Sequence, residues 1–144
     1  MKKKKGKKLL IYYAHCVALY NSPQEARDIM TLEELGFEVL NPNTEKNREG
    51  YQNYKALISQ GTIPVGSSMR YCPNPMQYFL NLVSSCDALA FRSLPSLEIP
   101  SGVAVEIQQA LDLDKPVIEL PSRFQKRRLN HEDTVDYLKE VGNR

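Results

Sequence analysis

The sequence predicts an α/β fold, a single domain whose mostly parallel sheet of four to five strands has helices on both faces. Three observations support this prediction. Short apolar runs alternate with amphipathic helical segments along the 144 residues, and 42% of these residues are hydrophobic, enough for one core. No change in composition marks a second domain. Strands that alternate with helices are joined by right-handed crossovers and lie parallel, which is typical of a doubly wound, flavodoxin or Rossmann-like sheet.

The first elements follow a basic leader, residues 1–8, which we expect to be disordered. Residues 9–14 are apolar and aromatic, as in a strand that is buried on both faces. Asn21, Ser22 and Pro23 supply a cap and a first-turn proline for a helix that ends at Gly36, and residues 37–40 form the second strand. The inward positions expected for this helix are Ala26, Ile29, Met30 and Leu35.

Residues 43–73 show no strong periodicity, and we interpret them as a candidate lid. Within them, residues 51–58 are compatible with a short helix. Order returns with a helix over 75–85, whose apolar face carries Met76, Phe79, Leu80 and Val83. The remaining elements are a strand at 88–91, a helix at 101–113, a strand at 116–120 and a final helix at 132–141, with Val135, Leu138 and Val141 expected to face inward.

Polar residues gather where the predicted strands end, the edge at which doubly wound sheets bind ligands. The residues at this edge are Tyr12, Tyr13, His15 and Cys16 after the first strand, Asn41 and Asn43 after the second, Arg92 and Ser93 after the third, and Ser101 and Glu106 in the helix that follows. Asp87 precedes its strand, so we expect it at the opposite end of the sheet.

The segment from Ile99 to Ala110 is the most informative part of the chain. Ser101 is expected to be the N-cap of a helix, and Gly102 allows a ligand to approach the backbone, so the first free N–H groups form a seat for an anion. Glu106 then lies just over one turn inside the helix.

Four segments in this order and spacing, IYYA at 11–14, LGFEVLNP at 35–42, CDALAF at 86–91 and SGVAVE at 101–106, resemble the nucleoside 2-deoxyribosyltransferase-like superfamily. The likeness spans residues 9–120 and implies the fold predicted above. It implies that Glu106 is a nucleophile that attacks C1′ of a deoxyribose, and that Tyr12 orients it. Cys16 and Ser101 stand where family members that hydrolyse nucleotides hold the 5′-phosphate. The likeness also implies a homodimer, because family sites are commonly completed by a second subunit.

The chain departs from this family at one position. The family carries an aspartate that helps to protonate the leaving base, and the corresponding stretch here is Gln77-Tyr78-Phe79-Leu80, without a carboxylate. The role would fall to a lid residue, to His15, to Asp28 or to a carboxylate of a partner subunit. Losing a general acid costs on the order of 10²- to 10⁴-fold in rate.

The expected function is therefore cleavage or transfer of the N-glycosidic bond of a nucleoside or deoxynucleotide, with Glu106 and Tyr12 as catalytic residues. The alternatives are a nucleotide-binding or sensing module without catalysis and a glycohydrolase that cleaves NAD. We expect no organic cofactor and no metal site, because His15 has no second ligand at metal spacing. The residues expected to bind substrate are Ser101, Gly102, His15, Cys16, Arg92 and Asn41.

Composition limits the partners. A net charge of +2 gives no strong basic surface, so nucleic-acid binding is not expected. No run of 18 apolar residues and no secretory signal is present, and the odd cysteine count, Cys16, Cys72 and Cys86, suits a reducing compartment. We expect a cytoplasmic protein.

Overall fold

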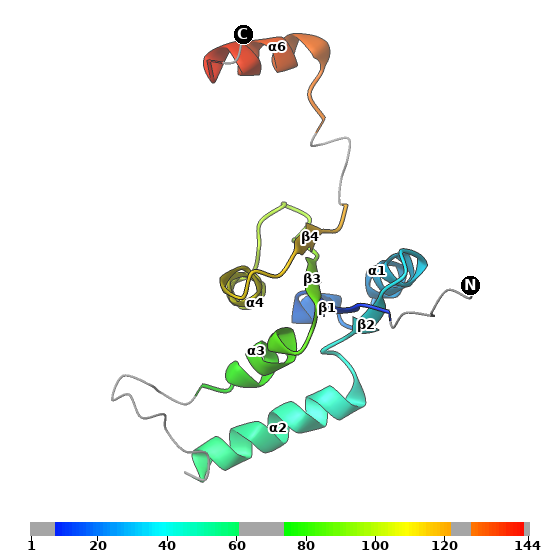
Figure 1. Ribbon diagram of the computed structural model, residues 1–144, viewed down its shortest axis with the longest axis vertical. Coiled ribbons are helices and arrows are strands. Elements are labelled where there is room, and N and C mark those ends of the chain that lie inside the picture. The colour runs from blue at the N-terminus through cyan, green and yellow to red at the C-terminus, as the bar shows by residue number, and fades with distance from the viewer. Residues whose placement is uncertain (1–7, 61–73, 122–127, 143–144) are drawn as a thin grey trace, which may run out of the picture.

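A four-stranded parallel sheet forms the centre of the computed structural model, which describes residues 8–60, 74–121 and 128–142 (Figure 1). The strand order is β2-β1-β3-β4, and all three neighbouring pairs are parallel. This arrangement confirms the predicted α/β fold, with four strands in the described part of the chain. The strands are β1 (Leu10–Ala14), β2 (Glu38–Leu40), β3 (Ala88–Phe91) and β4 (Val117–Glu119).

Helices cover both faces of this sheet. Helix α1 (Pro23–Glu34) lies on one side, and helices α3 (Gln77–Ser84) and α4 (Ser101–Asp112) lie on the other (Figure 1). Because side chains alternate along a strand, Tyr13 belongs to the apolar cluster under α1, whereas Tyr12 belongs to the cluster under α3 and α4. Both tyrosines are fully buried.

The start of the sheet is held by the residue that we placed at the end away from the site. The Asp87 carboxylate accepts a hydrogen bond from the backbone N–H of Leu10, at 2.7 Å. Leu10 is the first residue of β1, so the expectation that Asp87 lies at the opposite end of the sheet is confirmed.

Helix α1 begins as predicted, with the Ser22 hydroxyl accepting a hydrogen bond from the Glu25 backbone N–H, but its inward face differs. Ala26, Met30 and Leu35 were expected inside but are exposed, Met30 by 59% and Leu35 by 64%, whereas Ile29 packs against the core as expected. The buried positions of α1 are instead Glu25, Asp28 and Leu32. Hydrophobic spacing failed here because the two buried carboxylates have polar partners on other elements, described below.

The candidate lid begins with a long helix, α2 (Glu45–Ser59), capped by the side chain of Thr44. The expected short helix at 51–58 is the second half of α2. Helix α2 packs on α3 through aromatic rings, with the Tyr51 and Phe79 centroids 4.8 Å apart. Residues 61–73, the rest of the proposed lid, and Cys72 among them, lie outside the described residues, as does the leader at 1–7.

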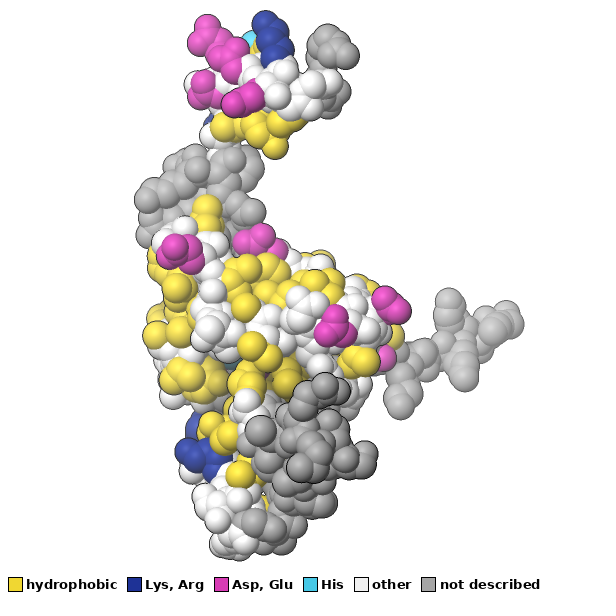
Figure 2. Space-filling model, turned by 90° about the vertical axis from the view of Figure 1, so that its left-hand side faces the viewer, with side chains coloured by type: hydrophobic (Ala, Val, Ile, Leu, Met, Phe, Trp, Pro, Cys, Tyr) yellow, Lys and Arg dark blue, Asp and Glu magenta, His cyan; other side chains and the backbone are white. Residues whose placement is uncertain are grey.

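The last helix, α6 (His131–Glu140), has no buried residue, so the expectation that its apolar side chains face inward is wrong. Leu138 is 36% exposed and Val141 53% exposed. Figure 1 shows α6 apart from the sheet, and Figure 2 shows hydrophobic side chains on the lower side of this helix. Amphipathic spacing predicted the helix correctly but not its distance from the sheet. No helix among the described residues is long and apolar enough to cross a membrane.

Candidate active site

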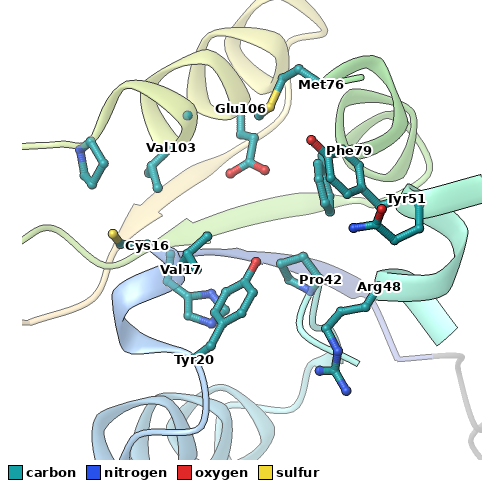
Figure 3. A pocket seen from close by; sticks show the side chains of 14 residues that line it. Cys16, Val17, Tyr20, Pro42, Arg48, Tyr51, Met76, Phe79, Val103 and Glu106 are labelled. Carbon is teal, nitrogen blue, oxygen red and sulfur yellow. The ribbon is translucent and has the colours of Figure 1, made fainter. Parts of the chain in front are cut away.

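A cavity of about 550 Å³ lies at the carboxyl ends of the strands (Figure 3). Its volume falls within the range of small-molecule sites in proteins. The loop after β1, the end of β2, helices α2 and α3 and the start of α4 all contribute to its wall. The lining residues are His15, Cys16, Val17 and Tyr20, then Pro42, then Arg48, Tyr51 and Gln52, then Met76 and Phe79, and finally Pro100, Gly102, Val103 and Glu106.

Glu106 is the only carboxylate among the lining residues, all of which belong to the described part of the chain. It lies in the second turn of α4, and its carboxylate points into the cavity (Figure 3). The Tyr12 hydroxyl, from β1, donates a hydrogen bond to Glu106 Oε2 at 2.7 Å. Residues 94 positions apart in sequence thus form a buried pair, in which Glu106 is only 6% exposed.

Burial raises the pKa of Glu106 to about 7, because the ionised carboxylate loses water that the protein does not replace. The hydrogen bond from Tyr12 acts in the opposite direction and favours the ionised form. Near neutral pH the group is therefore present in both protonation states. Perturbed carboxyl groups of this kind in a cavity are characteristic of catalytic sites.

A second tyrosine–carboxylate pair lies on the other face of the sheet. The Tyr13 hydroxyl donates to Asp28 Oδ2 at 2.6 Å, and Arg92 donates to the same carboxylate through Nε at 2.9 Å and through a terminal nitrogen at 2.5 Å. Burial raises the pKa of Asp28, but the bonds from Arg92 and Tyr13 outweigh it and lower this pKa below its ordinary value. Arg92, expected to bind substrate, is buried in this ion pair and also bonds the Pro121 carbonyl.

His15 lines the cavity with both of its ring nitrogens engaged. Nε2 lies 2.8 Å from Glu25 Oε2, and Nδ1 lies 3.0 Å from the Tyr13 carbonyl oxygen. The ring also stacks on Tyr13, with centroids 3.8 Å apart. No ring nitrogen of His15 is therefore left for a ligand.

The carboxylate that holds His15 is itself well supported. Glu25 also accepts hydrogen bonds from the Asn43 side chain at 3.0 Å and from the backbone N–H of Asn21 at 2.9 Å. Burial raises the pKa of Glu25, yet the bonds from His15 and Asn43 outweigh it and keep this pKa below its usual value. The polar face of α1 thus serves as the support for the loop after β1.

Of the other residues that the sequence suggested, some line the cavity and some do not. Cys16 and Gly102 line the cavity. A Cβ at Gly102 would meet only the end of the Met76 side chain, at 4.0 Å, so this residue leaves open space beside the start of α4. Ser101 is exposed and is the first residue of α4, whose N-cap is Pro100, so the N-cap prediction is wrong. Asn41 bonds the Asn43 backbone N–H through its side chain and is not among the lining residues.

The sequence did not suggest the aromatic and α2 side of the cavity. Arg48, Tyr51 and Gln52 have the spacing of neighbours on one helix face, a signal that identification of α2 would have revealed. Tyr20 lies in the turn after the short 3₁₀ helix η1 (Val17–Leu19). No sequence pattern marks it as a cavity residue.

Among the described residues, no group of three His, Cys, Asp or Glu side chains is placed to hold a metal ion. Comparisons of the chain with protein-family models and with curated proteins give no match. A functional interpretation therefore depends on the geometry around Glu106.

Proposed function

We propose that this protein cleaves or transfers the N-glycosidic bond of a nucleoside or deoxynucleotide, with Glu106 as the nucleophile. The observation that supports this most strongly is a buried carboxylate that points into a ligand-sized cavity and is held by Tyr12. The resemblance to the nucleoside 2-deoxyribosyltransferase-like superfamily assigns the same roles to the same two residues.

The chemistry follows from how the two oxygens of Glu106 are used. Tyr12 holds Oε2, so Oε1 is the oxygen that attacks C1′ of the sugar. A C1′–O bond forms, the C1′–N bond breaks, and its electron pair leaves with the base through an oxocarbenium-like transition state. Water or a second base then attacks C1′, which releases the carboxylate. Water gives hydrolysis, and a second base gives transfer.

The wall of the cavity is suited to a nucleotide. Tyr51 and Phe79 offer aromatic surface on which a base can stack. At the other end, the first turn of α4 has free backbone N–H groups beside Gly102, and such groups favour anions. A phosphate near Gly102 and a base near Tyr51 would bring the sugar between them, toward Glu106.

The leaving base also needs a hydrogen-bond donor or a proton. Asp28 does not supply it, because its carboxylate is bound to Arg92 and Tyr13 outside the cavity. His15 does not supply it either, because both ring nitrogens are engaged. A carboxylate from a second subunit is one remaining source, and a cytoplasmic homodimer is accordingly part of this proposal.

The test is base release from a panel of nucleosides and deoxynucleoside monophosphates by the wild type and by Glu106→Gln. We expect Glu106→Gln to slow release at least about 10³-fold, because the amide does not attack C1′. Glu98→Gln is the matched control, since Glu98 is exposed and lies outside the cavity. Full activity in Glu106→Gln would end the proposal.

A second candidate is a nucleotide sensor without turnover. It is favoured by the absence of any carboxylate other than Glu106 among the lining residues. A nucleotide that raises the melting temperature but is not cleaved over long incubation would support the sensor. Including NAD in the panel tests the third function, since release of nicotinamide would assign Glu106 to a nicotinamide riboside bond.

A further inference from the structure

The Tyr20 hydroxyl is a polar group of the cavity that the proposed chemistry has not used. Its side chain is half-buried and lines the cavity, and the hydroxyl points inward from the wall opposite Glu106 (Figure 3). Within the described residues this hydroxyl has no hydrogen-bond partner. It is therefore available to a ligand, whereas the Tyr12 hydroxyl is occupied by Glu106.

Tyr20 is held in place by a column of rings. Its ring lies against His15, with centroids 5.0 Å apart, and the His15 ring in turn stacks on the Tyr13 ring. His15 cannot easily turn, because its two nitrogens are bound to Glu25 and to the Tyr13 carbonyl. The Tyr20 hydroxyl is thus placed by the buried support, as preorganised donors in active sites are.

The electrostatic surroundings keep the hydrogen on this hydroxyl. Burial, and then the negative charge of Glu106, raise the pKa of Tyr20 to about 12. At neutral pH Tyr20 is accordingly a neutral O–H donor facing the cavity from the side opposite the nucleophile. His15, the other cavity group that we considered for the leaving base, has both ring nitrogens bound to partners outside the cavity's open space.

We propose that Tyr20 is a catalytic residue that donates a hydrogen bond to the base nitrogen that leaves C1′. This inference rests on the proposed function. As Glu106 Oε1 bonds to C1′ and the C1′–N bond breaks, the electron pair moves to the base nitrogen, where the Tyr20 O–H stabilises it. Water then supplies the proton that the free base keeps, so Tyr20 is unchanged at the end of the cycle. Tyr20 thereby takes the place of a second carboxyl group, which the lining residues do not include.

The experiment compares the wild type, Tyr20→Phe and Tyr137→Phe on a series of deoxynucleotides whose bases leave with different ease. We expect Tyr20→Phe to lower kcat on the order of 10²-fold for poor leaving bases, and much less for good ones, with little change in KM. Tyr137→Phe, an exposed position on α6, is the matched control and should behave as the wild type. Melting curves check that both variants are folded.

The other outcomes overturn the inference. An equal loss on all bases, or no loss, shows that Tyr20 does not assist departure of the base, while loss of activity in Glu106→Gln would keep the proposed function intact. If the wild type turns over no substrate, the proposed function fails. Ligand binding by the wild type and by Tyr20→Phe then tests whether the Tyr20 hydroxyl contacts the base. Weaker binding of a deoxynucleotide, but not of deoxyribose 5-phosphate, by Tyr20→Phe would still place its hydroxyl on the base. Equal deoxynucleotide binding by the wild type and Tyr20→Phe, or no binding by the wild type, would refute a contact between the Tyr20 hydroxyl and the base.

Discussion

Tyr12 and Tyr13 are neighbours in β1, and each donates a hydrogen bond to a buried carboxylate, but the two pairs differ in what surrounds them. On one face, Asp28 is bound by Arg92 as well as by Tyr13. On the other face, Glu106 has Tyr12 and a cavity of about 550 Å³. The first pair joins α1 to β1, with Arg92 reaching it from just after β3, and the second faces the space where a ligand fits.

This comparison indicates that the partners of a buried carboxylate, and a neighbouring cation above all, decide the direction in which its pKa moves. Burial raises the pKa of both groups, but only Asp28 has a guanidinium beside it, and its pKa is lowered as a result. Glu106 has no such partner within residues 8–60, 74–121 and 128–142, and its pKa is raised to about 7. The tyrosine–carboxylate hydrogen bond is thus part of a structural ion pair on one face of the sheet. On the other face it holds a carboxyl group that can gain or lose a proton near neutral pH.

The largest effect on stability should come from removing Arg92 from its ion pair with Asp28. Arg92→Met leaves the Asp28 carboxylate buried without a cation, and we expect a loss of about 3–5 kcal/mol in the free energy of unfolding. Denaturant melts at pH 7 measure it. The double variant Asp28→Asn/Arg92→Met, which has no buried charge to neutralise, should recover part of the loss. A single variant within 1 kcal/mol of the wild type would contradict the role that we assign to Arg92.

The Tyr12–Glu106 pair should make the stability of the protein depend on pH. The pKa of Glu106 is about 7 in the folded protein and 4.5 ordinarily, so the folded state binds the extra proton and stability falls as pH rises from about 4.5 to 7. The loss amounts to about 3 kcal/mol, since each pKa unit corresponds to about 1.4 kcal/mol. Glu106→Gln does not titrate there, so it should gain this amount on the wild type between pH 4 and pH 8.

The Asp28 pair has the reverse sign. Its pKa lies below the ordinary value of 3.8, so its contribution to stability is present above that pH and is lost as the pH falls further. Urea melts of the wild type and of Glu106→Gln across the pH range separate the two contributions. Parallel stability curves for the two proteins between pH 4 and pH 8 would show that the pKa of Glu106 is not raised.

The smallest expected effect is a shift in the pH dependence of activity, and it compares the hydroxyls of Tyr12 and Tyr13. Tyr12→Phe removes the bond that favours ionised Glu106, so we expect the pH at which activity is half-maximal to rise by about one unit. Activity depends on the ionised nucleophile and therefore rises with pH. Tyr13→Phe is the control, since it weakens only the Asp28 pair and should leave this midpoint unchanged. An unchanged midpoint in Tyr12→Phe would mean that its hydroxyl does not tune Glu106.

Much of the fold could be predicted because its signals are local. The strand at 88–91 and the cap at Ser22 are fixed by the properties of neighbouring residues, and the structure has both. The burial of α1 and α6 could not be predicted in the same way. Glu25 and Asp28 are buried because His15 and Arg92 meet them, and α6 is exposed because it lies apart from the sheet.

For the candidate site, the sequence by itself determined the alternation of strands and helices and the edge of the sheet at which polar residues gather. It also placed Glu106 in the helix beside that edge. Only the tertiary structure decided which of these residues meet. Tyr12 and Glu106 are 94 positions apart, and Arg92 and Asp28 are 64 apart. Periodicity is a property of adjacent residues, whereas the protonation state and availability of a side chain depend on burial and on partners that only folding brings together.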